Sequence, residues 1–152
     1  KRWKLIERNE VPQGHEPLPS MWAMRRKRDL TTNEVTKHKA RLNLHGGKQQ
    51  FGVNYFETYA PVVTWIAIRL MIIFSILFGW FMRQIDFVQA YPQAPIETDM
   101  FMELPYGIDT KHGNAKDHVL QLVSNLYGQK QAGRVWNGYM VEKLIDCGFQ
   151  PS

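Results

Sequence analysis

The chain has 152 residues, of which 44% are hydrophobic, so it has the composition of a globular protein with one modest core or two small lobes. Its one cysteine excludes an internal disulfide, and its five dispersed histidines show no zinc-ligand spacing. The net charge of +5 is uneven, because residues 1–50 hold twelve Lys or Arg against five acids and the remainder holds seven against nine. A basic first third favours an anionic partner such as nucleic acid or nucleotide, although a solvated basic surface explains the same charges.

Residues 1–21 contain "VPQGHEPLP", whose prolines and glycine predict a loose lead-in segment. The chain has no start methionine and no signal-like beginning, so we expect a piece of a longer polypeptide.

A β-hairpin is expected next. "MWAMRRKRD" and "VTKHKARLNLH" predict two strands joined by the turn "LTTNE". Alternation in the second strand puts Lys37, Lys39 and Arg41 on one face, and Ala40 and Leu42 on the other. Such a strand closes a small core with one face and presents cations with the other.

Pro61 and Thr64 predict the start of a helix, and Gly79 predicts its end. The run 66–78 is apolar nearly all round, which raises the alternative of a membrane span. It is shorter than the roughly 20 residues that a bilayer requires, and it contains Arg69. The pattern therefore predicts a buried core helix and no membrane contact.

Three strands and a helix are expected in the second half. "WFMRQIDFVQAY" predicts a strand that ends near Asp86, and "DMFMELP" and "HVLQLVSNLYG" predict two more. "QAGRVWNGYMVEKLIDCGF" has apolar residues at helical spacing and Gly148 at the C-cap. The order predicts an α+β fold in which helices pack on an antiparallel sheet.

Asp86 is the one acid in the otherwise uncharged stretch "QIDFVQAYPQAP". A carboxylate between apolar neighbours is costly unless something pairs with it. A divalent cation such as magnesium meets this need, because it binds one or two carboxylates together with substrate phosphates. A solvent-facing or helix-capping acid is the alternative.

Four blocks together carry a resemblance to a known family: "KHKARLNLHGGKQQFGVNYFETYAPVV", "IRL", "RQIDFVQAYPQAPIETDMFMELPYGI" and "LYGQKQAGRVW". In this order and spacing they resemble the reverse transcriptase domain of copia-type retrotransposon polyproteins. The resemblance runs from about Trp22 to Ser152.

The resemblance implies a right-hand polymerase fold, with fingers at about 22–80 and the first part of a truncated palm at about 81–152. It implies that Asp86 is the first catalytic aspartate, which helps to hold two Mg²⁺ ions for nucleotidyl transfer, and that the carbonyl of Phe87 helps to hold one of them.

The same resemblance implies substrate contacts. Lys39 and Arg41 match a basic pair that clamps the triphosphate, with ordinary surface charge as the alternative. Tyr91 matches an aromatic residue that excludes a 2′-hydroxyl, with a core tyrosine as the alternative.

Within "LYGQKQAGRVW", the resemblance implies that Gly128 and Lys130 pass near the nucleotide and that Gln131 touches the template. Gly133 departs from the family, which usually has a proline there. The stretch 87–99 also departs from its commonest version but keeps the aromatic residue five positions after the aspartate.

The paired aspartates that complete the family's site are missing from these 152 residues. Asp99, Asp109, Asp117 and Asp146 do not form such a pair, so the chain alone is expected to be inactive.

The implied partners are an RNA template, a DNA primer, deoxynucleoside triphosphates and the integrase and RNase H of the parent polyprotein. The family implies an intracellular location, in cytoplasmic particles or the nucleus. Two alternatives stay open: a non-enzymatic basic nucleic-acid-binding module, and a decayed copy of a retroelement.

Overall fold

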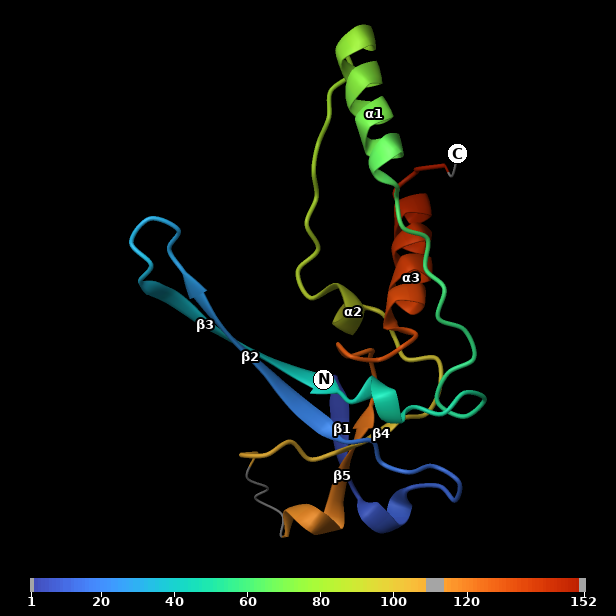
Figure 1. The fold of residues 1–152 in the computed structure, drawn as a ribbon. Helices are drawn as coiled ribbons and strands as arrows, with labels where there is room; N and C mark the ends of the chain where they lie inside the picture. Colours follow the sequence, from blue (N-terminus) through green and yellow to red (C-terminus); the bar gives the residue numbers. More distant parts are fainter. Residues whose placement is uncertain (1, 109–113, 151–152) are drawn as a thin grey trace.

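The computed structural model describes residues 2–108 and 114–150, so Asp109 and Ser152 lie outside the described residues. The fold has a three-stranded antiparallel sheet in the order β1-β5-β4 and a separate two-stranded antiparallel sheet of β2 and β3 (Figure 1). Within the described residues, it also has three α-helices and three 3₁₀ turns. The predicted α+β class is confirmed.

Strand β1 (Trp3–Glu7) lies within the segment that the sequence predicts to be a loose lead-in, and it corrects that prediction. It pairs antiparallel with β5 (His118–Leu122), with Trp3 opposite Leu122. The prolines lie beyond the end of the strand, and the strand itself depends on a partner from the far end of the chain. Such a partner leaves no local signal in the sequence.

The predicted hairpin is confirmed as β2 (Ser20–Arg28) and β3 (Val35–Leu44). In the turn, Asp29 Oδ1 accepts hydrogen bonds from the backbone nitrogens of Thr31 at 2.8 Å and Thr32 at 3.0 Å. These two hydrogen bonds hold the pKa of the Asp29 carboxyl below its usual value, and the bond from Thr32 has the larger effect. The strands extend well beyond the rest of the fold (Figure 1).

The core lies where the base of this hairpin meets the three-stranded sheet. Leu44 at the end of β3 is 1% exposed, and Met102 of β4 (Phe101–Glu103) is fully buried. The buried cluster comprises Leu18, Leu44, Met100, Met102, Leu120, Leu122 and Leu126. The base of the hairpin is therefore fixed by packing, whereas its far end projects into solvent.

Helix α1 (Trp65–Phe78) has the predicted ends. Thr64 Oγ1 accepts from the Ala67 nitrogen at 3.3 Å, and Gly79 adopts φ 65° at the C-cap. Its predicted burial is wrong, because Ser75 is its one buried residue and Trp65 and Ile76 are each 75% exposed. The helix rises beyond the end of α3, away from both sheets (Figure 1). Over the described residues, no helix has the length and apolar character that a membrane crossing requires.

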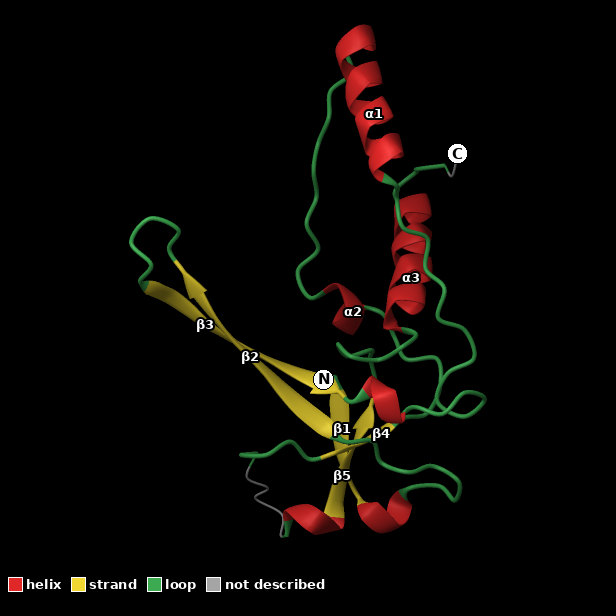
Figure 2. Ribbon diagram, viewed as in Figure 1, coloured by secondary structure: helices red, strands yellow, loops and turns green. Residues whose placement is uncertain are grey.

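The strand predicted to end near Asp86 does not form. Residues 80–87 have no regular structure, and the connections 49–64 and 79–89 on either side of α1 are almost entirely loop (Figure 2). A strand requires a partner for its backbone hydrogen bonds. The edges of the described three-stranded sheet are β1 and β4, so residues 80–87 do not extend that sheet.

The short helix α2 (Ala90–Gln93) follows that loop, and α3 (Ala132–Asp146) is the predicted C-terminal helix. Gly148 at φ 89° and the bond from the Phe149 nitrogen to the Leu144 carbonyl, at 3.0 Å, confirm its cap. The expectation that helices pack on the antiparallel sheet is wrong: α2 packs against α3, and both stand beside the sheets (Figure 1). The 3₁₀ turns are η1 (Arg8–Glu10), η2 (Gly46–Lys48) and η3 (Ala115–Asp117).

Candidate functional site

The site is built on a close backbone contact between the end of β3 and the turn before α3. The Leu44 nitrogen donates to the Tyr127 carbonyl at 2.9 Å. A Cβ at Gly128, which has φ 91°, would lie 2.2 Å from the Leu44 carbonyl oxygen, and a Cβ at Gly46 would lie 2.0 Å from the Gly128 oxygen. Only glycine fits at both positions. This contact holds Tyr127 beside β3.

A cavity of about 660 Å³ opens between β3, the loop that follows α1, and Tyr127. It is lined by Lys37, His38, Lys39, Ala40, Arg41, Asp86, Phe87, Val88, Gln89 and Tyr127. Four residues singled out from the sequence, Lys39, Arg41, Asp86 and Phe87, therefore face one space although they come from distant parts of the chain.

Asp86 is exposed, and its neighbours Ile85 and Phe87 are 70% and 40% exposed. The premise that this carboxylate is surrounded by buried apolar groups is therefore wrong, because the predicted strand is a loop and water solvates the charge. Among the cavity-lining residues that the structure describes, Asp86 is the one acid. The described chain contains no group of three or more His, Cys, Asp or Glu side chains that could hold a metal ion.

The basic face of the hairpin continues from the cavity. The register places Arg25 opposite Lys39 and Lys27 opposite Lys37, so these side chains lie on the same face as Arg41. Among the described ion pairs none involves this face. The charge of Lys27 is the main reason that the pKa of Lys39 is lowered, with smaller contributions from burial, Arg41 and Lys37. Uncompensated like charges in this arrangement favour an anionic ligand.

Lys27→Gln is expected to raise the pKa of Lys39 towards its ordinary value, because the charge that lowers this pKa most is removed. The measurement is an NMR titration of the lysine side chains. The pKa of Lys39 is lower in the folded chain than in the unfolded chain. Repulsion between charged Lys39 and its neighbours therefore opposes folding at pH values below the folded-state pKa. This cost disappears as the pH rises through that pKa and Lys39 loses its proton. Lys4→Gln on β1 is the matched control, and a Lys39 pKa that responds equally to both variants would contradict this account.

Tyr127 is a functional candidate that the sequence analysis missed. The Arg41 guanidinium carbon lies 5.6 Å from the centroid of the Tyr127 ring, and the Tyr91 and Tyr127 ring centroids are 5.3 Å apart. Tyr91 is half-buried and, although it packs against Tyr127, it does not line the cavity. The available signal was the position of Tyr127 next to Gly128 in "LYGQKQ".

Arg2 is a second residue that the sequence analysis missed. Its guanidinium donates to Gln89 Oε1 at 2.8 Å and to the Pro92 carbonyl. Gln89 has φ 54° and is the N-cap of α2. The N-terminal segment therefore fixes the end of the loop that carries Asp86.

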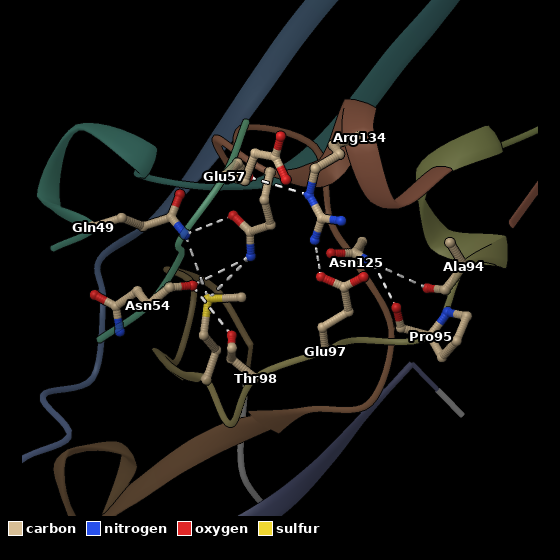
Figure 3. Close-up of polar contacts among 11 residues, drawn as sticks. Gln49, Asn54, Glu57, Ala94, Pro95, Glu97, Thr98, Asn125 and Arg134 are labelled. Atoms are coloured by element: carbon tan, nitrogen blue, oxygen red, sulfur yellow. Dashed lines mark hydrogen bonds and ion pairs between the residues drawn. The ribbon is translucent and has the colours of Figure 1, made fainter. Parts of the chain in front are cut away.

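Lys130 and Gln131 are not brought to the cavity. Lys130 Nζ donates to the Gln49 carbonyl and the Tyr55 hydroxyl, each at 3.2 Å, and lies 4.7 Å from the centroid of the Tyr55 ring. Gln131 is 4% exposed, and its Oε1 accepts from Gln49 Nε2 at 2.9 Å. Asn54 continues this network by accepting from Thr98 Oγ1 at 3.1 Å (Figure 3). In the described structure these residues attach α3 to the chain after β3.

Two further sets of contacts surround this network. Arg134 of α3 donates to the Glu57 carbonyl at 3.3 Å and forms an ion pair with Glu97 (Figure 3). The Asn125 amide, which is fully buried, donates to the Ala94 carbonyl at 3.3 Å and to the Pro95 carbonyl at 2.7 Å (Figure 3). These contacts hold α3 against the chain around Glu57 and Glu97, and the segment before Tyr127 against the residues that follow α2.

Comparison with known proteins places the chain in a family. The family model described as reverse transcriptase (RNA-dependent DNA polymerase) matches residues 1–152, so the chain belongs to the reverse transcriptase family. The resemblance to copia-type retrotransposon polyproteins is confirmed by the curated relatives. No solved structure matches the chain.

Three relatives are Pol polyproteins of plant transposons. The retrovirus-related Pol polyprotein from transposon TNT 1-94 of Nicotiana tabacum is 31% identical over 88% of this chain and 10% of its own length. Those from transposons RE1 and RE2 of Arabidopsis thaliana are 31% and 32% identical, over 97% and 76% of this chain and 10% and 8% of their own lengths. The chain thus spans about a tenth of the length of these relatives.

Proposed function

We propose that the cavity between β3 and the Asp86 loop receives the triphosphate of an incoming deoxynucleotide in RNA-directed DNA synthesis. The observation that carries the proposal is that Lys39, Arg41 and Asp86 line the same cavity. Two cations on one strand face bind and orient phosphate oxygens, and Arg41 adds a planar pair of donors. In this proposal, residues of about 22–80 act as fingers, and those of about 81–152 as the first part of the palm.

The residues present fit a magnesium ion that arrives with the nucleotide. Mg²⁺ usually retains waters and binds one or two carboxylates together with substrate phosphates. The Asp86 carboxylate and the Phe87 carbonyl would hold it, since both residues line the cavity. When bound, the ion would neutralise negative charge on the phosphates during nucleotidyl transfer.

The remaining candidates take different roles in this proposal. Tyr91 acts on sugar selection through the Tyr127 ring that it packs against. Lys130 contributes positive charge near the path of the nucleic acid. The positions of Gly128 and Gln131 favour roles in holding the turn before α3 against β3.

The partners that we propose for the parent polyprotein are an RNA template, a DNA primer, deoxynucleoside triphosphates and the accompanying integrase and RNase H. A second candidate function, nucleic-acid binding without catalysis, is favoured by the basic hairpin face. That face bears Arg25, Lys27, Lys37, Lys39 and Arg41. The two functions differ in whether binding depends on the Asp86 carboxylate.

The 152-residue chain alone is expected to extend no primer, because it offers one carboxylate in the cavity where two-metal transfer needs more. The measurement is incorporation of labelled deoxynucleotide on a primer–template with magnesium, in parallel with binding of the same primer–template at increasing salt. Retained, salt-sensitive binding without extension agrees with the proposal. Robust extension by the chain alone would contradict it.

A further inference from the structure

Tyr127 links the two halves of the cavity. It lines the cavity together with Arg41 and Asp86, its ring lies under the Arg41 guanidinium at 5.6 Å, and it packs against Tyr91 at 5.3 Å. Its backbone cannot move independently of β3, because its carbonyl accepts from the Leu44 nitrogen at 2.9 Å.

Arg41 has no ion pair among the described residues, and it lies on the same strand face as Lys39. A free arginine side chain samples many rotamers and loses that freedom when it binds an anion. An aromatic ring beneath the guanidinium restricts those rotamers before the anion arrives, and the attraction between cation and ring does not use the N–H donors.

We propose that Tyr127 is a positioning residue that holds the Arg41 guanidinium over its ring, ready to bind the phosphates of a nucleoside triphosphate. This inference rests on the proposed function, since it assigns a role to Tyr127 in the same cavity. Tyr91 supports the ring by packing against it. Tyr127 therefore acts through Arg41, and its effect on binding requires Arg41 to be present.

The test is a double-mutant cycle on the 152-residue chain, with magnesium-bound dTTP as the probe and calorimetry as the measurement. Tyr127→Leu is expected to weaken binding about two- to fivefold, and Tyr127→Phe, which keeps the ring, is expected to leave it unchanged. In an Arg41→Gln background, Tyr127→Leu should cause no further loss. Tyr106→Leu is the matched control, because Tyr106 is 96% exposed and outside the cavity lining.

Two further measurements do not require that Tyr127→Leu folds with full stability: the affinity of Arg41→Lys, and the NMR shifts of Arg41 in wild type. Arg41 is exposed, so Arg41→Lys should fold. It keeps the charge but loses the planar stacking group, and it should therefore lose affinity to a similar extent. In wild type, the NMR shifts of the Arg41 δ-protons should show the ring current of Tyr127, and that shift should disappear in Tyr127→Leu.

An equal effect of Tyr127→Leu with and without Arg41 would overturn this inference. Full affinity of Arg41→Lys for dTTP would overturn it as well. So would δ-proton shifts of Arg41 that show no ring current from Tyr127. In each of those cases a wild-type chain that binds dTTP still supports the proposed function. A wild-type chain with no saturable binding of magnesium-bound dTTP would overturn the proposed function and this inference with it.

Discussion

Asp86→Asn is expected to weaken the binding of a magnesium-bound deoxynucleoside triphosphate by about tenfold or more. Asp86 is the one acid among the described residues that line the cavity, and asparagine keeps its size while removing the charge that a cation needs. In the presence of a chelator, the same substitution should leave affinity unchanged or raise it, because a negative charge has been removed beside Lys39 and Arg41. Calorimetric titrations with magnesium and with chelator give both affinities.

The matched control is Asp99→Asn, because Asp99 is an exposed acid that does not line the cavity. It should leave both affinities unchanged. A nucleic-acid-binding module without a nucleotide site would respond to neither substitution in magnesium. Equal affinities of wild type and Asp86→Asn in magnesium would therefore favour that module over a polymerase site.

Gly128→Ala is expected to lower the free energy of unfolding by about 3 kcal/mol or more. Two costs combine: a non-glycine residue is strained at φ 91°, and the new Cβ would lie 2.2 Å from the Leu44 carbonyl oxygen. The backbone fixes the position of the Cβ, and the atom that it meets is a backbone oxygen, so no side-chain rotation relieves the clash. Because Tyr127 is adjacent, the variant should also bind magnesium-bound dTTP more weakly. Urea unfolding followed by circular dichroism measures the stability.

Gly138 offers a matched control in α3, because a Cβ there meets nothing within 4 Å. Gly138→Ala should stabilise the chain by about 0.5–1 kcal/mol, since alanine is the better helix former. The two glycine substitutions are thus expected to act in opposite directions. Equal stability of Gly128→Ala and wild type would show that the turn before α3 does not depend on its contact with β3.

Local signals in the sequence predicted the elements whose ends are set by neighbouring residues. Thr64 and Gly79 define α1, Gly148 caps α3, and alternation defines β3, because caps and side-chain faces depend on nearby residues. What the sequence did not predict depends on distant partners. Strand β1 needs β5, and the run 80–87 is apolar enough for a strand but finds no partner among the described residues.

The burial of α1 shows the same limit. A helix that is apolar on every side carries no information about which element covers it, and in the described structure Trp65 and Ile76 remain largely exposed. An apolar surface of this extent favours association, so we expect the isolated chain to be poorly soluble.

The candidate site was predictable in its charged members and not in its supporting ones. Alternation places Lys39 and Arg41 on one strand face, and the family resemblance singles out Asp86. In the structure these three residues line one cavity. Tyr127 and Arg2 were missed, because their roles come from contacts across the fold: the guanidinium of Arg41 over a ring, and a hydrogen bond to Gln89.

Photoaffinity labelling shows directly whether a nucleoside triphosphate binds between β3 and the Asp86 loop. The chain is irradiated with 8-azido-dATP and magnesium, and the modified peptides are identified by mass spectrometry. Labelling is expected within residues 37–41, within residues 86–89 or at Tyr127, and excess dATP or a chelator should abolish it. Labelling confined to α1, or to the separate cavity of about 570 Å³ lined by residues 14–19, would contradict it.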